Sequence, residues 1–341
     1  MTVLAIETSC DDTCAAVVDG DGTVRSNVVA SQHEHDRFGG VVPEIASRHH
    51  LQAIDAVIDH ALLEAGCALS DIELVAATQG PGLIGALLVG LSSAKGIAAA
   101  RRLPFAGVDH IAGHIAANFL RVEDGPFEPP FVCLIASGGH TMIARVEGRG
   151  DYRILGRALD DAAGEAFDKG ARLLGLGYPG GAALEELARA GDPDAFAFPG
   201  SAAARRGRGR PSALDGTLDF SFAGLKTALL YKLRELGDQQ ARERAADLAA
   251  SYQRAIVDSL FDRCERALAA DGCGRLAVGG GVGANGELRL RLAELDARVH
   301  VPPRELCTDN AAMIAAAALC GEPIVYPDYL GLDAYPTGTP Q

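Results

Sequence analysis

The sequence repeats one pattern, an apolar strand, a polar turn and a second apolar strand, near its start and again in its second half. The first copy is IETSCDDTCAAVV, with its turn at residues 8–13, and the second is LIASGGHTMIARV, with its turn at residues 137–141. The two copies share few identical residues, so we interpret the repeat as a structural one. Two β-hairpins, each followed by helical and strand segments, predict two lobes of α/β type. The 341 residues are enough for two domains, each with its own core.

A polar, proline-containing stretch at residues 121–130 separates the two copies and predicts the domain boundary. We therefore expect domains at residues 1–122 and 123–341, and leave open whether the C-terminal helix packs back on the first lobe. That helix follows the run CTDN, in which Thr308 or Asp309 is a natural N-cap. Glycine-rich turns at residues 80–82 and 279–285 each lead from a strand into a helix. Such turns either present N–H groups to an anion or are simply tight, and the sequence does not decide.

Two hairpin-led halves, each with helices on its sheet, resemble the actin-like, sugar-kinase and chaperone ATPase superfamily (ASKHA). The resemblance implies an α/β fold of two lobes around a central cleft. In that superfamily, glycine-rich hairpin turns face the nucleotide phosphates, and a later Gly-Gly turn packs on the adenosine. The layout fits nearly the whole length of this chain.

Two histidines four residues apart, His110 and His114, lie in an alanine-rich run just after an expected strand at residues 104–109. On a helix, residues i and i+4 share one face, so both imidazoles could bind one ion. This is the spacing of the HExxH zinc helix, but Ile111 replaces the general-base Glu of that motif, which disfavours a metalloprotease. The alternative is structural, with one histidine capping a turn and the other packed. The pair alone favours neither.

The net charge of −14 disfavours nucleic-acid binding by bulk charge, so a nucleic-acid partner would need a local basic patch or a second protein. The densest cationic run contains Arg205, Arg206, Arg208 and Arg210 among Gly and Ala. Such a run is either a solvated loop or a contact for phosphates.

The sequence predicts a cytoplasmic protein without a membrane segment. Its N-terminus has no basic n-region and no small-residue cleavage site, which disfavours a signal peptide. The eight cysteines form no CxxC pair and are expected to be reduced. The longest apolar run, residues 83–100, is interrupted by Ser92, Ser93 and Lys95, and we expect a buried helix there.

Ten segments between residues 6 and 315 occur in a diagnostic order: IETSCDDT (6–13), GGVVPEIASRHH (39–50), GPGLIGALLVG (80–90), HIAGH (110–114), SGGHT (137–141), DDAAGEAFDK (160–169), YPGG (178–181), DFSFAGLKT (219–227), GGGVGAN (279–285) and CTDNAAMIA (307–315). Together they resemble the bacterial tRNA N6-adenosine threonylcarbamoyltransferases, a family formerly described as O-sialoglycoprotein endopeptidases. Each segment alone is a weak signal, and their combination is specific.

The resemblance implies a site made from four groups of residues. His110, His114 and Asp309 would ligate one divalent metal, with iron preferred to zinc. Asp11 and Asp12 would lie beside the phosphates and are the candidates for a catalytic base. The phosphate and acyl part of the donor would be lined by Ile135, Ala136, Ser137, Gly138 and Gly139, and its nucleotide would contact Asp168, Gly181, Glu185 and Asn285.

Four positions depart from the family's pattern. Gly283 stands where Ser is common, Ala112 where Glu is common, and Asp12 where Glu is frequent. Archaeal and eukaryotic relatives have a tyrosine as a further metal ligand where this chain has Ile135. These departures leave the coordination number and the identity of the metal open.

The implied reaction is acyl transfer from threonylcarbamoyl-AMP to the N6 amine of the adenosine 3′ of the anticodon, in tRNAs that read codons beginning with adenine. The implied partners are tRNA, a smaller ASKHA paralogue and a P-loop ATPase subunit, with a separate synthase that makes the donor. Two alternatives stay open. An ASKHA-type small-molecule kinase would need no histidine pair, and a nucleotide-binding scaffold subunit would not need the three metal ligands.

Overall fold

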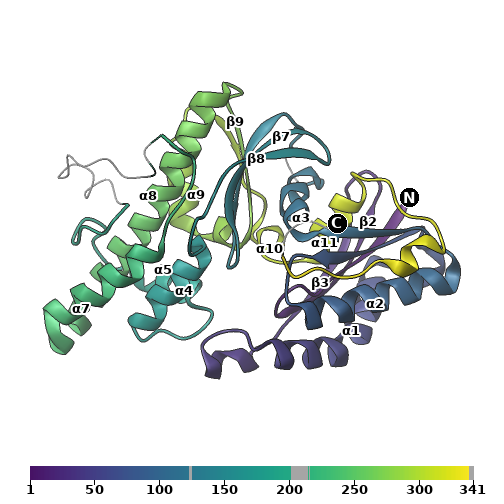
Figure 1. The fold of residues 1–341 in the computed structure, drawn as a ribbon, viewed down its shortest axis with the longest axis horizontal. Helices are drawn as coiled ribbons and strands as arrows, with labels where there is room; N and C mark the ends of the chain where they lie inside the picture. The colour runs from purple at the N-terminus through teal and green to yellow at the C-terminus, as the bar shows by residue number, and fades with distance from the viewer. Residues whose placement is uncertain (123–124, 201–213, 215, 338–341) are drawn as a thin grey trace. The chain divides into compact units, whose positions relative to one another are not determined.

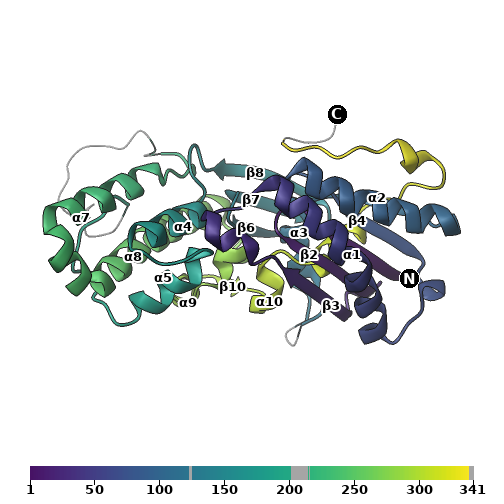
Figure 2. The same ribbon diagram turned by 90° about the horizontal axis from the view of Figure 1, so that it is seen from below.

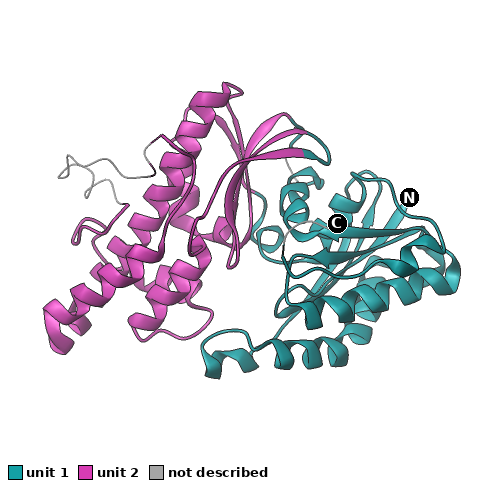
Figure 3. Cartoon of the chain, in the orientation of Figure 1, with its two compact units in different colours: residues 1–129, 148–151, 302–341 teal, residues 130–147, 152–301 magenta. Residues whose placement is uncertain are grey.

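The computed structural model describes residues 1–122, 125–200, 214 and 216–337 (Figures 1 and 2). The chain forms two compact units (Figure 3). Unit 1 comprises residues 1–129, 148–151 and 302–341, and unit 2 comprises residues 130–147 and 152–301. The boundary expected between residues 122 and 123 lies close to the end of the first segment of unit 1, and the last segment of the chain belongs to that unit. The division into domains at residue 122 stays a prediction.

Unit 1 is built on a five-stranded sheet with the order β3-β2-β1-β4-β5. Strand β1 pairs antiparallel with β2 and parallel with β4, and its apolar run VLAI is fully buried, as expected for a central strand. The strands are β1 (Thr2–Glu7), β2 (Asp12–Asp19), β3 (Val24–Ser31), β4 (Leu74–Gly80) and β5 (Phe105–Asp109).

Helices α1 (Pro43–Ala65) and α2 (Ile84–Arg101) cover one face of this sheet, and α3 (His110–Ala116) and α11 (Ala311–Ala318) pack together on the other (Figures 1 and 2). By length and composition α2 could cross a membrane; in the structure it packs on β4 and α1 with one face, and 33% of its residues are buried. The short elements of the unit are η1 (Glu34–Phe38), η2 (Leu69–Asp71), η3 (Ala117–Phe119), α10 (Arg304–Cys307) and η5 (Asp328–Gly331).

Unit 2 repeats the plan of unit 1, with the sheet order β10-β9-β6-β7-β8. The hairpin strands β6 and β7 pair antiparallel, and β9 pairs parallel with β6, as β4 does with β1. The structural repeat predicted from the two hairpins is therefore confirmed. The strands are β6 (Phe131–Ala136), β7 (Thr141–Gly148), β8 (Asp151–Arg157), β9 (Arg275–Gly279) and β10 (Arg298–His300).

The helices of unit 2 share one large apolar core with this sheet. The long helix α8 crosses that core, and Tyr252 on it is fully buried and donates a hydrogen bond to the Ala166 carbonyl at 2.9 Å. Helix α7 is interrupted at Gly237, whose φ of 73° suits glycine. The helices are α4 (Ala163–Leu173), α5 (Gly180–Ala188), α7 (Ala223–Glu243), α8 (Ala245–Asp271), η4 (Gly281–Ala284) and α9 (Gly286–Leu292).

Both glycine-rich turns that the sequence left undecided serve close packing. A Cβ on Gly82 would lie 2.6 Å from the Ser9 carbonyl oxygen, and the Leu83 N–H donates to that same carbonyl at 2.8 Å. In unit 2, Gly280 has a φ of 89°, and a Cβ there would lie 2.4 Å from the Ala136 carbonyl oxygen. Glycine is thus required at both turns by the close approach of a backbone carbonyl from a neighbouring segment.

Candidate metal centre

Helix α3 presents both histidines on one face because its N-terminus is fixed one residue before His110. The Asp109 carboxylate accepts hydrogen bonds from the backbone N–H groups of Ile111 (2.9 Å) and Ala112 (3.0 Å), which makes it the N-cap. His110 is therefore the first helical residue, and His114 follows one turn later. Both side chains are buried, at 5% and 0% exposure.

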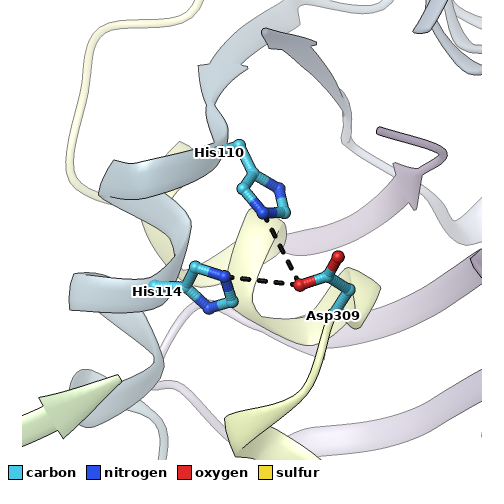
Figure 4. Close-up of side chains that lie close together, drawn as sticks. All are labelled: His110, His114 and Asp309. Carbon is cyan, nitrogen blue, oxygen red and sulfur yellow. Dashed lines mark ion pairs between the residues drawn. The ribbon is translucent and has the colours of Figure 1, made fainter. Parts of the chain in front are cut away.

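Asp309 reaches the same place from the loop before α11. The N-cap of α11 is Asn310, whose Oδ1 accepts a hydrogen bond from the Met313 N–H at 3.0 Å. The predicted cap at Thr308 or Asp309 is wrong, because the helix begins at Ala311 and residue 310 holds the capping position. The Asp309 carboxylate instead faces the two histidines (Figure 4).

A glycine lets α3 approach α11. A Cβ on Gly113 would lie 2.9 Å from Ile314 Cδ1 and 3.3 Å from Met313 Cγ, both on α11. The short distance between these helices brings the histidines to the loop that carries Asp309. Gly113, a residue between the two histidines that binds no metal itself, is therefore needed for the packing of α3 on α11.

The three side chains have the separations of ligands to one ion. Asp309 Oδ1 lies 3.5 Å from His110 Nε2 and 3.3 Å from His114 Nε2, and the ligand atoms all lie within 4.8 Å of one another (Figure 4). Bonds of about 2.0–2.2 Å at a tetrahedral angle place two ligand atoms about 3.4 Å apart. The two distances from Asp309 Oδ1 to the histidine nitrogens match that value.

His114 provides an independent test of the fit. Its ring is fully buried, and neither ring nitrogen has a hydrogen-bond partner among the described residues. A buried polar atom without a partner is costly, and metal ligation through Nε2, which lies 3.3 Å from Asp309 Oδ1, would give that nitrogen a partner. Two imidazoles and one carboxylate are a donor set suited to iron or zinc. The residues present therefore fit a divalent ion.

Glu7 was not among the predicted site residues, yet it contacts the cluster. Its Oε2 lies 3.0 Å from His110 Nδ1, and its side chain is completely buried. Burial alone would raise the pKa of Glu7, but the charge and hydrogen bond of His110 outweigh it and lower the pKa below its ordinary value. Burial likewise opposes the charged form of His110, but the carboxylates of Asp309 and Glu7 raise the pKa of this histidine to about 9. Without a metal, the pair is ionised at neutral pH.

Asp11 and Asp12 lie in and just after the turn between β1 and β2. Burial is the main cause that raises the pKa of Asp12 to about 6; a hydrogen bond with Ser31 opposes it, and the charges of Asp309 and Asp11 add to it. A carboxyl that titrates near neutral pH suits proton transfer. The catalytic roles of Asp11 and Asp12 stay predictions.

In unit 2, the residues predicted for the donor's phosphate and acyl part form the end of β6 and the turn after it: Ile135, Ala136, Ser137, Gly138 and Gly139. The Ser137 N–H donates to the His140 carbonyl at 2.8 Å, and the His140 N–H donates to Ser137 Oγ at 3.2 Å. Gly138 and Gly139 at the tip are exposed, and a Cβ at either would meet nothing within 4 Å.

The residues predicted for the nucleotide lie on α4, on α5 and directly before α9: Asp168, Gly181, Glu185 and Asn285. Asn285 is the N-cap of α9, and its Nδ2 donates to Gln253 Oε1 at 2.9 Å and to Glu185 Oε2 at 3.3 Å. Asp168 Oδ1 accepts a hydrogen bond from the N–H of Gly180, the first residue of α5, at 2.8 Å. The structure thus joins Asn285 to Glu185, and Asp168 to the start of the helix that contains Gly181.

Three neighbours of the metal centre were missed by sequence reasoning: Glu7, Asp109 and Tyr335. An Asp directly before a helical run is a recognisable N-cap signal and could have identified Asp109. The Tyr335 hydroxyl donates to Asp109 Oδ2 at 2.8 Å, and a single tyrosine near the chain end gives no such signal. The arginine run at residues 205–210 lies outside the described residues.

Solved structures with the same fold define the class of protein. HypF of T. kodakarensis matches 93% of this chain and 47% of its own, with a TM-score of 0.59 and 15% sequence identity. Component A of the (R)-2-hydroxyglutaryl-CoA dehydratase from Acidaminococcus fermentans matches 94% of this chain and 96% of its own, with a TM-score of 0.53 and 14% identity. At these identities the likeness concerns the fold alone. Together with the two repeated sheets, it confirms an ASKHA-type α/β protein.

The sequence comparison identifies the family. The family model of TsaD, tRNA N6-adenosine threonylcarbamoyltransferase, matches residues 23–316. Proteins of that name from Clostridium beijerinckii and Trichlorobacter lovleyi are 49% and 51% identical to this chain over 93% of its length, and over 91% and 90% of their own. The chain belongs to this family of transferases, and the resemblance based on the ten segments is confirmed.

Proposed function

We propose that this chain transfers the threonylcarbamoyl group from threonylcarbamoyl-AMP to the N6 amine of the adenosine 3′ of the anticodon, in tRNAs that read codons beginning with adenine. The family supports the reaction class. The observation that carries the proposal is the buried cluster of His110, His114 and Asp309, which a scaffold subunit or a sugar kinase of this fold would not require.

The proposed cluster holds one divalent metal, with iron preferred to zinc. When bound, such an ion supplies Lewis-acid stabilisation of developing negative charge on the donor's oxygens. Ile111 occupies the position of the general-base Glu of HExxH, so the helix lacks the residue that peptide hydrolysis by that motif requires. Acyl transfer makes no such demand on residue 111.

The turn after β6 is proposed to hold the donor's phosphate. The N–H groups of Ser137 and His140 are used within the turn, whereas those of Gly138 and Gly139 donate to no acceptor in the described part of the chain. Two adjacent N–H groups on an exposed, uncrowded tip are available to donate to an anion. Asp12, with its raised pKa, is proposed to accept the proton that the N6 amine loses, with Asp11 as the alternative.

The nucleotide of the donor is proposed to contact Asp168, Gly181, Glu185 and Asn285. Glu185 and Asn285 are already hydrogen-bonded to each other, so their polar atoms are ordered before a ligand arrives. Gly181 leaves space, because a Cβ there would meet nothing within 4 Å. A base or ribose could therefore approach the backbone at this position.

The test is nucleoside mass spectrometry of tRNA after reaction. The chain is incubated in a cytoplasm-like buffer with tRNA, threonine, bicarbonate and ATP, together with the proposed partners: the smaller ASKHA paralogue, the P-loop ATPase subunit and the donor synthase. We expect threonylcarbamoyladenosine only when the chain is present. Undiminished product from the His110→Ala, His114→Ala double variant would indicate a scaffold. Transfer of phosphate from ATP to a small molecule, with release of ADP and without modified tRNA, would indicate a kinase.

A further inference from the structure

Glu7, the last residue of β1, is a buried carboxylate held by three hydrogen-bond donors. Its Oε1 accepts from the Ser9 N–H, and its Oε2 accepts from the Thr78 hydroxyl and from His110 Nδ1, the last at 3.0 Å. Within the described ranges, its ion-pair partner is His110, and no lysine or arginine pairs with it. A buried carboxylate is costly unless its oxygens are hydrogen-bonded and its charge is paired, so the contact with His110 is central to the environment of Glu7.

The contact determines which nitrogen of His110 carries a proton. An ionised carboxylate only accepts hydrogen bonds, so Nδ1 must be the donor. Ser9 Oγ also lies 3.2 Å from Nδ1, but a hydroxyl both donates and accepts and therefore selects neither tautomer. When the ring gives up one proton to bind an ion, the proton that stays is therefore the one on Nδ1, and the Nε2 lone pair faces the site that Asp309 Oδ1 borders, 3.5 Å away.

We propose that Glu7 is a positioning residue of the metal centre, which keeps a proton on His110 Nδ1 and orients the ring so that Nε2 is the ligand atom. The proposal rests on the proposed function only in requiring an ion at the cluster. Carboxylates that accept from the second nitrogen of a ligating histidine raise its basicity and fix its orientation.

Glu7 contacts His110 and has no hydrogen bond with His114 among the described residues. His114 Nδ1 has no hydrogen-bond partner in the described segments, so no carboxylate fixes the proton on that nitrogen as Glu7 does for His110. Its ring lies edge-on to the His110 ring, with the centroids 4.7 Å apart. Because Glu7 contacts only the first of the two rings, a substitution there should alter one ligand and leave the other in place.

The first measurement uses the unmodified chain. We load it with Zn²⁺ and record nitrogen-15 NMR of the histidine rings. The expected result is a proton on His110 Nδ1 and none on Nε2. A His110 signal with the proton on Nε2 would overturn the proposal without any variant having to fold. A parent chain that binds no metal would remove both the proposed centre and this role of Glu7.

The second measurement compares two variants that disturb the same carboxylate. Glu7→Gln removes the charge and one acceptor, whereas Thr78→Val removes a donor to Oε2 and leaves the His110 contact intact. We titrate each with Co²⁺ and follow the visible absorption of the bound ion. Glu7→Gln should weaken binding by about 10–100-fold and change the spectrum. Thr78→Val should stay within about threefold of the parent and keep its spectrum, since the outer-shell bond to His110 survives.

Equal weakening in Glu7→Gln and Thr78→Val would mean that Glu7 acts through packing, and the proposal would be wrong. Unchanged Co²⁺ affinity in Glu7→Gln would also overturn it, while leaving the metal centre and the proposed transfer reaction intact. If Glu7→Gln does not fold, Glu7→Asp replaces it. That variant keeps the charge but is one methylene shorter, and the same loss is expected because the carboxylate no longer reaches Nδ1.

Discussion

At the scale of single residues, the two histidines differ in their hydrogen-bond partners. His110 Nδ1 lies within hydrogen-bond distance of Glu7 and Ser9, whereas neither ring nitrogen of His114 has a hydrogen-bond partner among the described residues, and its Nε2 lies 3.3 Å from Asp309 Oδ1. The chain therefore has two ligand candidates of different character on one helix face. Replacing His114 or Asp309 therefore tests the proposed metal ligands themselves, whereas replacing Glu7 tests a residue that orients a ligand.

We predict that His114→Ala lowers metal affinity by more than the roughly 10–100-fold typical of a lost outer-shell contact, because a direct ligand is removed. Transfer activity should be lost with the metal. The measurement is metal analysis of the purified variant. Full metal content in the His110→Ala, His114→Ala double variant would show that the metal binds at other residues.

Asp309→Asn should reduce metal content to a similar degree. Because Asn310 is the N-cap of α11, the substitution leaves the capping bonds intact, and the melting temperature should stay close to that of the parent. Thermal melting of the metal-free protein measures this. A large drop would show that Asp309 supports the fold as well.

Asp12 should destabilise the metal-free chain at neutral pH. Its folded pKa of about 6 lies above the ordinary value of 3.8, so the unfolded chain loses this proton first as the pH rises. The cost is absent below the ordinary pKa and complete above pH 6, where it amounts to about 3 kcal/mol. Asp12→Asn should therefore stabilise the chain by up to about 3 kcal/mol at pH 7.5 and by only about 1 kcal/mol at pH 4.5. Urea unfolding at both pH values tests this, and an equal gain at the two values would exclude charge as the cause.

At the scale of elements, the hairpins and most helices followed from hydrophobic patterning, because each strand of the repeat is a short apolar run with a polar turn beside it. The caps were harder to predict. Thr308, Asp309 and Asn310 are all good N-cap residues, and only the backbone shows which of them precedes the first turn. Glu7 was missed for a related reason: a carboxylate at the end of a strand commonly faces solvent, and its buried donors lie far away in the sequence.

The N-cap of α9 yields an element-scale prediction that separates folding from binding. Asn285→Ala should cost about 1 kcal/mol of stability, because it removes the cap, and should also weaken AMP binding. Asn285→Ser keeps an oxygen that can cap the helix but loses the amide that contacts Glu185 and Gln253. It should lose less stability than Asn285→Ala, because the cap is kept, and its AMP binding should be weakened as in that variant.

Calorimetric titration with AMP and thermal melting provide the two measurements. Asp168→Ala should weaken AMP binding as well, with some loss of stability because the Gly180 N–H loses its acceptor. Parent-like AMP affinity in all three variants would place the nucleotide away from these residues.

At the scale of the whole molecule, two units with the same sheet topology have different residues at their hairpin turns. The hairpin of unit 1 lies next to the cluster of two histidines and Asp309, and the hairpin of unit 2 carries the glycine tip. The repeat could be predicted because it is local in each half. The convergence of α3 and α11 could not, because it joins segments distant in the sequence and depends on Gly113 permitting close approach.

The negative charge of the whole chain affects how it can bind tRNA. The net charge is −14, whereas the proposed acceptor is a polyanion, so tRNA attraction needs a local cationic stretch or a partner subunit. The densest such stretch in the sequence contains Arg205, Arg206, Arg208 and Arg210. Each neutralised phosphate releases counterions, so every contact adds about one unit to the log–log salt dependence of binding, slightly less on single strands.

We predict that replacing all four arginines with Ser weakens tRNA binding and flattens its salt dependence, by up to about four units if every arginine contacts a phosphate. Metal content and AMP affinity should not change, since the residues proposed for those sites lie elsewhere in the sequence. The measurement is tRNA binding over a salt series, with the partner subunits present. As a control that removes three cationic charges elsewhere, Arg234, Arg242 and Lys232, which lie on α7, are replaced with Ser, and the slope should stay near that of the parent. The same slope in the four-arginine variant and the parent would assign tRNA attraction to other residues of the chain or to a partner subunit.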